Sequence, residues 1–251
     1  MSVIKEAAVE NLEQNFATDL ISLRKTAFVA GVLYLITFVS IPTLSLYSSV
    51  HDPNYIVGFG PDTSALIGAL LELIVAFACI GTAITLFPIL MRQNEGVAVG
   101  FVASRILEAS AIFVGIACIL SIVSLRQAGV EENALVAGQV LITVYDRTFL
   151  LGQGVMPAVN ALLLGSLLYQ SRLVPRTLPL LGIIGAPLLL AAHAAVVFGF
   201  IDRVSPLAGI AALPIALWEL SLGIWLVFKG FNPIALVNLL DYRKFPLERN
   251  A

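Results

Sequence analysis

Residues 63–90 read TSALIGALLELIVAFACIGTAITLFPIL, and Glu72 is the one charged residue among them. A helix needs about 20 consecutive, mostly apolar residues to cross the hydrocarbon core of a bilayer. This segment exceeds that length, so it predicts a transmembrane helix. Soluble domains have about 25% charged residues, whereas this chain of 251 residues has 12% charged and 59% hydrophobic residues. We therefore expect the bilayer to surround most of the chain.

Apolar runs of similar length recur on both sides of this segment. They cover residues 26–49, 97–125, 149–170, 178–201 and 206–229. Together the six runs predict an all-α fold, a polytopic membrane helical bundle with about six transmembrane helices. The formal net charge of −2 gives no reason to expect nucleic-acid binding. The sequence has no Gly-rich phosphate loop and no metal-type spacing of Cys and His, so we expect no cofactor and no metal. Cys79 and Cys118 are expected to be buried free thiols.

The bundle is expected to occupy residues 25–230, with a more polar segment on either side. Residues 1–24 predict an amphipathic interfacial helix, because apolar residues recur there at helical spacing between acidic ones. Residues 231–251 form a predicted cytoplasmic tail, in which a short helix begins at Asn232-Pro233 and runs to about Leu240. Residues 130–148 are too polar to span the membrane beside the next run. We expect them to form an extracytoplasmic helix that leads into the fourth span.

Proline and aspartate mark several helix boundaries. Asp62 is placed to cap the helix that begins at residue 63. Pro179 and Pro206 lie in predicted first turns, where the missing N–H is not needed. Five other prolines lie inside predicted spans and predict kinks there: Pro42, Pro88, Pro157, Pro187 and Pro214.

Lysine and arginine are distributed unequally between the two sides of the predicted bundle. One side has ten of them: Lys5, Arg24, Lys25, Arg92, Arg172, Arg176, Lys229, Arg243, Lys244 and Arg249. The other side has Arg126, Arg147 and Arg203. Cytoplasmic loops carry the excess of basic residues. The bias therefore predicts an inner (plasma) membrane protein with both its N- and C-termini in the cytoplasm.

Ionisable and polar residues lie well inside the predicted spans, although a charge at the bilayer centre costs at least about 2.5–3.5 kcal/mol. The candidate ligand-binding or proton-binding residues are Glu72, Arg105, Glu108, Asn160, His193 and Glu219. Two glutamates are centred on stripes of small residues, where membrane helices approach closely. The stripes are Ala65, Gly68, Glu72, Ala76, Cys79 and Ala83, and Ala212, Ala216, Glu219 and Gly223. We expect these side chains to face the interior of the bundle.

The charges of this set do not balance. Three glutamates accompany one certain cation, Arg105, so a shared pocket is less costly if at least one glutamate is protonated at neutral pH. A neutral carboxyl can donate a proton or a hydrogen bond. A structural interpretation competes with this one. In it Arg105 and Glu108 neutralise each other, His193 is a satisfied core histidine, and Asp146-Arg147 forms an interfacial ion pair.

The C-terminal end of the bundle has a distinctive sequence, LWELSLGIWLVFKGFNP, over residues 217–233. This segment, NALLLGSLLYQSRLVPR over residues 160–176 and the Arg105/Glu108 pair resemble the bacterial domain-of-unknown-function 4386 family. The resemblance covers about residues 26–233 and implies a multi-helix membrane protein of bacterial type. It implies no assigned reaction, so no catalytic residues carry over from the family.

Three functions remain open from the sequence. The first is a protein that binds or transports a small molecule in an acidic and Arg-containing cavity near the bilayer midplane, coupled to protonation. The second is an intramembrane enzyme in which a protonated glutamate acts as general acid on a neutral lipid or isoprenoid. The third is a structural or accessory membrane subunit. The expected partners are membrane lipid, a small-molecule or lipid ligand, and further copies of the chain in a homo-oligomer.

Overall fold

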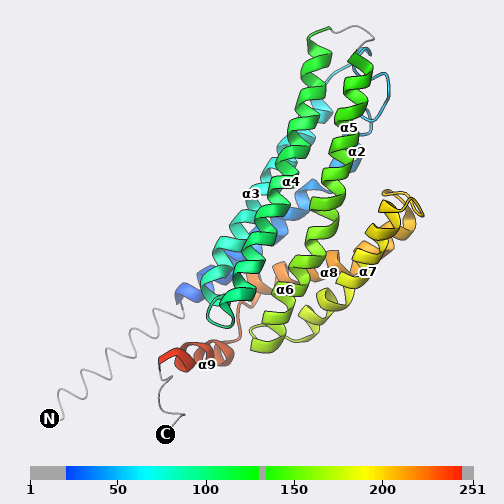
Figure 1. The fold of residues 1–251 in the computed structure, drawn as a ribbon. Coiled ribbons are helices and arrows are strands. Elements are labelled where there is room, and N and C mark those ends of the chain that lie inside the picture. The colour runs from blue at the N-terminus through cyan, green and yellow to red at the C-terminus, as the bar shows by residue number, and fades with distance from the viewer. Residues whose placement is uncertain (1–20, 130–133, 245–251) are drawn as a thin grey trace, which may run out of the picture.

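The computed structural model describes residues 21–129 and 134–244, with side chains described as far as residue 239, and all regular structure in these residues is helical (Figure 1). A helix over residues 21–36 is followed by η1 (Thr37–Ser40), α2 (Thr43–Leu46), α3 (Thr63–Leu90), α4 (Glu95–Gln127), α5 (Leu135–Phe149), η3 (Leu150–Val155), α6 (Met156–Ser171), α7 (Thr177–Val197), α8 (Pro206–Phe228) and α9 (Pro233–Lys244). Six helical spans are long and apolar enough to cross a membrane, which confirms the predicted bundle. Residues 1–20 of the predicted interfacial helix lie outside the described residues.

The fourth span is longer than predicted. The segments α5, η3 and α6 form one continuous span over Leu135–Ser171, so most of the polar segment 130–148 belongs to it, and residues 130–133 lie outside the described residues. The helix widens into a π turn at η3. Pro157 explains the widening, because it has no N–H to donate and its ring crowds the carbonyl of Gln153 four residues earlier.

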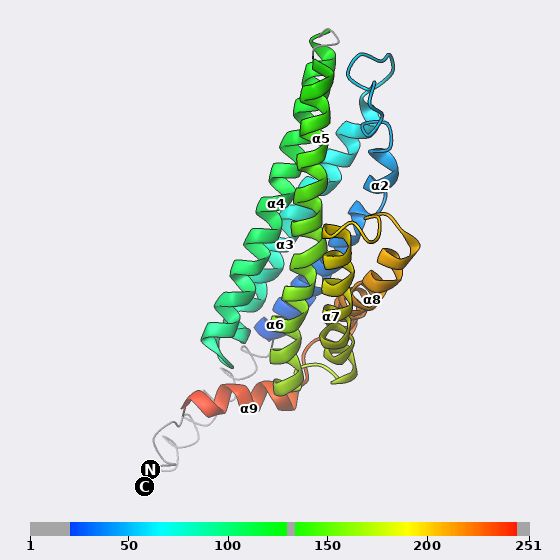
Figure 2. The same ribbon diagram turned by 45° about the vertical axis from the view of Figure 1, so that its right-hand side comes forward.

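The spans differ strongly in length. The fourth span has 37 residues and α4 has 33, whereas α7 has 21 and α8 has 23. At 1.5 Å per residue, the two long spans extend about 50–55 Å and the two short ones about 32–35 Å. In Figures 1 and 2, α4 and α5 accordingly reach well beyond the α7–α8 loop, at the end of the bundle opposite α9. The molecule therefore has a long half and a short half.

One end of the bundle gathers both ends of the described chain. Arg24 donates hydrogen bonds to the carbonyls of Leu226 and Val227, at 2.9 and 2.7 Å. The N–H of Asn232 donates to the carbonyl of Leu173 at 2.8 Å. The first helix, the α6–α7 loop and α9 therefore meet at this end (Figure 2). The short helix predicted from Asn232-Pro233 is confirmed as α9.

At the other end, the side chain of Asp62 has a different role from the predicted one. Asp62 does occupy the N-cap position of α3, but its side chain makes no capping hydrogen bond. Instead it accepts from Arg126 at 2.9 Å, Gln127 at 3.0 Å and Tyr55 at 2.7 Å. Burial alone would raise the pKa of Asp62, but these hydrogen bonds outweigh it and lower the pKa. The charged partner explains the choice, because bonds to charged groups are the stronger ones.

Small residues set the closest helix contacts. Gly31 of the first helix and Gly223 of α8 bring their backbones together, so an added Cβ at Gly31 would lie 2.7 Å from the Gly223 carbonyl oxygen. Such backbone approach is typical of membrane helices. All six positions of the small-residue stripe predicted on α3 are buried. At Gly182 of α7 the close neighbour is a side chain, because the indole ring of Trp218 on α8 packs against this glycine.

Candidate functional site

A cavity of about 340 Å³ lies between the first helical span and α8. The two helices touch at Gly31 and Gly223. Farther along, Thr37–Ile41 on one side and Ala208–Glu219 on the other both line the cavity. The remaining wall comes from α3, α4, the fourth span, α7 and the α7–α8 loop. Its residues are Val75, Cys79, Arg105, Glu108, Phe149, Gln153, Gly154, Pro157, Leu189, His193 and Arg203. The cavity is therefore a wedge that opens from a glycine contact.

Arg105 lies at the inner surface of this wedge and is 1% exposed. Its guanidinium donates to Glu108 at 2.9 Å and to Glu219 at 3.4 Å, and it contacts the Cys79 sulfur at 3.6 Å. The guanidinium carbon lies 5.0 Å from the centroid of the Tyr34 ring, a cation–π distance. The Nε atom is buried and has no hydrogen-bond partner among the described residues. One buried cation is thus shared between two carboxylates.

The two carboxylates are held very differently. Glu108 accepts from Arg105 at 2.9 Å and from Asn160 Nδ2 at 2.7 Å, and its side chain is 6% exposed. Asn160 is itself fixed by a short hydrogen bond from Ser104. Glu219 makes one side-chain hydrogen bond among the described residues, at 3.4 Å from Arg105, and its side chain is 15% exposed. Glu108 is therefore locked in place, whereas Glu219 faces the cavity with acceptor capacity to spare.

Glu72 has its own pocket, separate from the Arg105 group. It is 1% exposed and accepts hydrogen bonds from Tyr145 at 3.0 Å, Tyr47 at 3.2 Å and Gln153 at 3.2 Å. None of these donors is charged. Gln153 also lines the cavity, because the π turn directs it there. The side chain of Gln153 therefore connects the Glu72 pocket with the cavity.

His193 lies across the cavity on α7. Its Nδ1 is 2.9 Å from the carbonyl oxygen of Leu189, which can only accept, so Nδ1 carries a proton and neutral His193 has a free lone pair on Nε2. The imidazole packs against Gly154, where an added Cβ would overlap the Nε2 atom. Gly154 is thus needed for the histidine to stand where it does.

A polar cluster adjoins the cavity through Arg203. Arg203, from the α7–α8 loop, lines the cavity and donates to Asp146 of α5 at 2.8 Å. His51 Nε2 lies 3.1 Å from the same Asp146 oxygen, and His51 Nδ1 lies 2.8 Å from the carbonyl of Tyr47. Both partners of the imidazole are acceptors, so both hydrogen bonds form together only when His51 is protonated. The hydrogen bond with Asp146 raises the pKa of His51.

The prediction that Asp146 pairs with Arg147 is wrong. Asp146 pairs with Arg203 and His51 instead. Residues that are adjacent along a helix point to different faces, so Asp146 and Arg147 do not meet. The charged neighbour comes from a loop that is distant in sequence.

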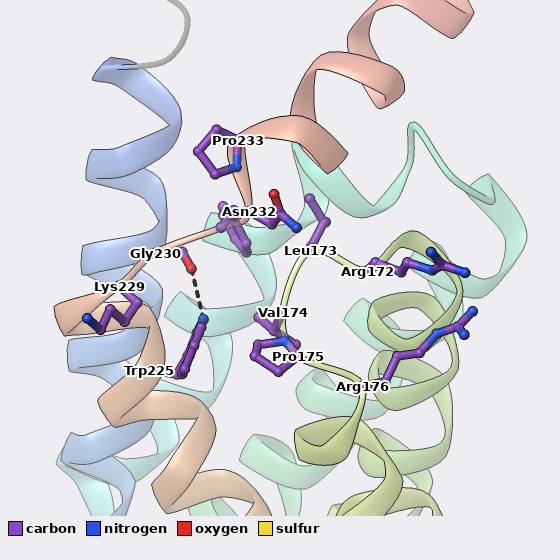
Figure 3. A pocket seen from close by; sticks show the side chains of 11 residues that line it. Arg172, Leu173, Val174, Pro175, Arg176, Trp225, Lys229, Gly230, Asn232 and Pro233 are labelled. Carbon is purple, nitrogen blue, oxygen red and sulfur yellow. Dashed lines mark hydrogen bonds between the residues drawn. The ribbon is translucent and has the colours of Figure 1, made fainter.

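A second hollow, of about 550 Å³, lies between the α6–α7 loop and the end of α8 (Figure 3). Arg172, Arg176 and Lys229 are among its lining residues. In Figure 3 the two arginine side chains point to one side and Lys229 points to the other. The three cations do not converge, so this hollow lacks the arrangement that a single charged group requires. The wedge-shaped cavity, where charged groups do converge, is the better candidate.

Four of the six predicted candidates, Arg105, Glu108, His193 and Glu219, line the cavity. Asn160 lies behind Glu108, and Glu72 lies in the neighbouring pocket. Sequence reasoning missed Tyr34 and the two tyrosine donors to Glu72. Nothing in their local sequence distinguishes them from packing aromatics. It also gave Arg203 no role in the site, since its position near a span boundary indicated only an outer loop.

Within residues 21–129 and 134–239, no group of three or more His, Cys, Asp or Glu side chains is placed to hold a metal ion. Residues 29–230 match the sequence model of the family described as Domain of unknown function (DUF4386). No curated protein and no solved structure gives a significant match to the chain. The family match covers most of the chain and confirms the resemblance of the Glu219 and Arg105/Glu108 segments. The chain belongs to the DUF4386 family of membrane helical proteins.

Proposed function

We propose that this protein binds a small molecule in the wedge-shaped cavity within the membrane and transports it, with protonation of Glu219 as the coupling step. The observation that carries the proposal is the position of Glu219, which faces a cavity of about 340 Å³ and is held by a single 3.4 Å contact. A purely structural carboxylate at this depth is expected to be fully bonded, because an unsatisfied charge in the membrane is costly. Glu108 meets that expectation and Glu219 does not.

The lining of the cavity supports a ligand that is partly apolar. Phe38, Ile41, Phe149 and Leu189 share the wall with the charged groups. Ligand sites commonly combine an apolar lining with a few placed polar groups. We propose further that the end carrying Arg24, Arg172 and Lys229 faces the cytoplasm of the cell, because basic residues accumulate there.

Native mass spectrometry of the protein purified in mild detergent tests ligand binding. The comparison is between wild type, Glu219→Gln and Glu72→Gln, since Glu72 is a buried carboxylate that does not line the cavity. A small molecule retained by wild type and Glu72→Gln but lost from Glu219→Gln supports the proposal. Ligand-free wild type after purification and after incubation with membrane extracts contradicts it.

Transport requires a separate measurement in proteoliposomes that contain a pH-sensitive dye. Flux of the retained molecule accompanied by proton movement, and absent in Glu219→Gln, supports coupling. Binding without flux reduces the proposal to a membrane receptor. The enzyme hypothesis has its own test, because identical lipid extracts from cells with and without the gene contradict it.

A further inference from the structure

The charged groups around the cavity carry an excess of negative charge. Four carboxyl groups of the described residues lie in or next to the cavity: those of Glu72, Glu108, Asp146 and Glu219. Two guanidinium groups, those of Arg105 and Arg203, accompany them. With all of these ionised, His193 neutral and His51 protonated as its two hydrogen bonds require, the difference is a formal charge of −1. An unbalanced charge at this depth is costly.

The pairing of these groups locates the excess. Arg203 lies 2.8 Å from Asp146, and Arg105 lies 2.9 Å from Glu108, so each guanidinium has one close carboxylate. The two carboxylates that remain are Glu72 and Glu219. Glu72 is satisfied by three neutral donors. Glu219 is the carboxylate whose charge is left for a ligand to balance.

From this geometry we infer that the ligand is an amphipathic organic monocation, a protonated amine on an apolar body, whose ammonium group pairs with Glu219. The inference rests on the proposed function and adds the class of ligand. The spare lone pairs of Glu219 agree with it, because a carboxylate that faces the cavity accepts from an N–H donor. The apolar body lies against Phe38, Phe149 and Leu189, which line the same cavity.

The alternative to a cationic ligand is an anionic one, and two buried N–H groups without partners favour this alternative. Arg105 Nε and Arg203 Nη1 have no hydrogen-bond partner among the described residues. An unsatisfied N–H of this kind costs about 1–3 kcal/mol. Bringing a third negative charge beside Glu108 and Glu219 costs more, because like charges in a water-poor cavity repel strongly. Both N–H atoms are also covered by protein, so a ligand in the cavity does not reach them.

Three probes with the same six-carbon body test the charge of the ligand: hexylamine, hexanol and hexanoate. Each is titrated into the purified full-length protein at neutral pH, and the midpoint of thermal unfolding and native mass spectra report binding. The proteins are wild type, Glu219→Gln and the matched control Glu72→Gln. Partition of the probes into detergent affects all three proteins equally, so the differences between them report the site.

The expected result is binding of hexylamine to wild type and Glu72→Gln, with roughly 30-fold weaker binding to Glu219→Gln. Equal or tighter binding of hexanol or hexanoate overturns the cationic class while leaving a ligand-binding cavity in place. Absence of binding for all three probes overturns both the class and the proposed function. Unchanged hexylamine affinity in Glu219→Gln also overturns the inference, because another group then holds the amine.

Discussion

The carboxylate of Glu219 lies 3.4 Å from the guanidinium of Arg105, although 114 positions separate the two residues in the chain. The contact joins α8 to α4, which otherwise have little direct contact. Among the described residues it is the one ion pair that α8 makes with the rest of the bundle. The Arg105–Glu219 ion pair therefore connects two helices of the bundle and also lines the candidate ligand cavity.

The unequal bonding of Glu108 and Glu219 predicts unequal effects on stability. Glu108→Gln removes the close partner of a buried guanidinium, and such losses cost about 3–5 kcal/mol. Glu219→Gln removes a longer contact of a partly exposed side chain and is expected to cost about 1 kcal/mol or less. The free energy of unfolding in mixed detergent micelles, followed by circular dichroism, measures both. Equal losses in the two variants would contradict the assignment of Glu108 as the locked residue.

A larger residue at Gly154 is expected to clash with His193, and a substitution of His193 is expected to relieve the clash. Gly154→Ala places a methyl group in the His193 ring, so we expect a loss of about 1–3 kcal/mol from overpacking. In the His193→Ala background the same change is expected to be nearly neutral, because the ring is gone. Gly209→Ala is the control, since a Cβ there meets nothing within 4 Å. A destabilising Gly154→Ala that His193→Ala does not relieve would assign the effect to the π turn instead.

Much of the fold followed from the sequence because hydrophobic length is a local property. Five of the six predicted runs agree with the observed spans within a few residues at most ends, for example 63–90 with Thr63–Leu90. The fourth span was predicted to begin at residue 149, but it begins at Leu135. Residues 135–148 are polar because α5 lies near one end of the long half, where a helix continues without needing apolar side chains.

Site residues were predictable from the sequence only where placing the residue in the membrane has a high free-energy cost, as it has for a charged side chain. A buried charge is expensive wherever it occurs, so Arg105 and the three glutamates stood out from the sequence. The partners of those charges did not. Tyr145 reaches Glu72 across 73 positions, and only the fold brings them together. The π turn that directs Gln153 toward the cavity likewise depends on how one helix accommodates Pro157.

Tyr145 is expected to stabilise an ionised Glu72. Tyr145→Phe leaves the carboxylate with two neutral donors, and a hydrogen bond to a charged group contributes about 1.5–3 kcal/mol. In a Glu72→Gln background the acceptor is uncharged, so the cost of Tyr145→Phe is expected to fall to about 1 kcal/mol. A double-mutant cycle on unfolding free energies gives the difference. No coupling between the two positions would indicate that Glu72 is protonated.

His51 predicts a dependence of stability on pH. Its pKa is raised in the folded protein by the hydrogen bond with Asp146, so its stabilising effect is complete below the unfolded value of about 6.5. The effect is lost as the pH rises through the raised pKa. Because the pair is partly exposed, we expect at most about 1 kcal/mol. His51→Gln compared with wild type at about pH 5.5 and pH 8.5 measures it, and a difference that grows toward high pH would contradict the sign.

The helices of the two halves differ in length relative to the thickness of the bilayer. The α7–α8 pair, about 32–35 Å long, matches a hydrocarbon core of about 30 Å with only modest tilt. The α4 helix and the fourth span, about 50–55 Å long, extend past the hydrocarbon core of about 30 Å at any ordinary tilt. A change in bilayer thickness changes how well the short α7–α8 pair matches the hydrocarbon core, but it has little effect on the longer helices. It is therefore expected to shift the two halves relative to each other. Both α4 and α8 line the cavity, so the length of the lipid chains is expected to affect its width.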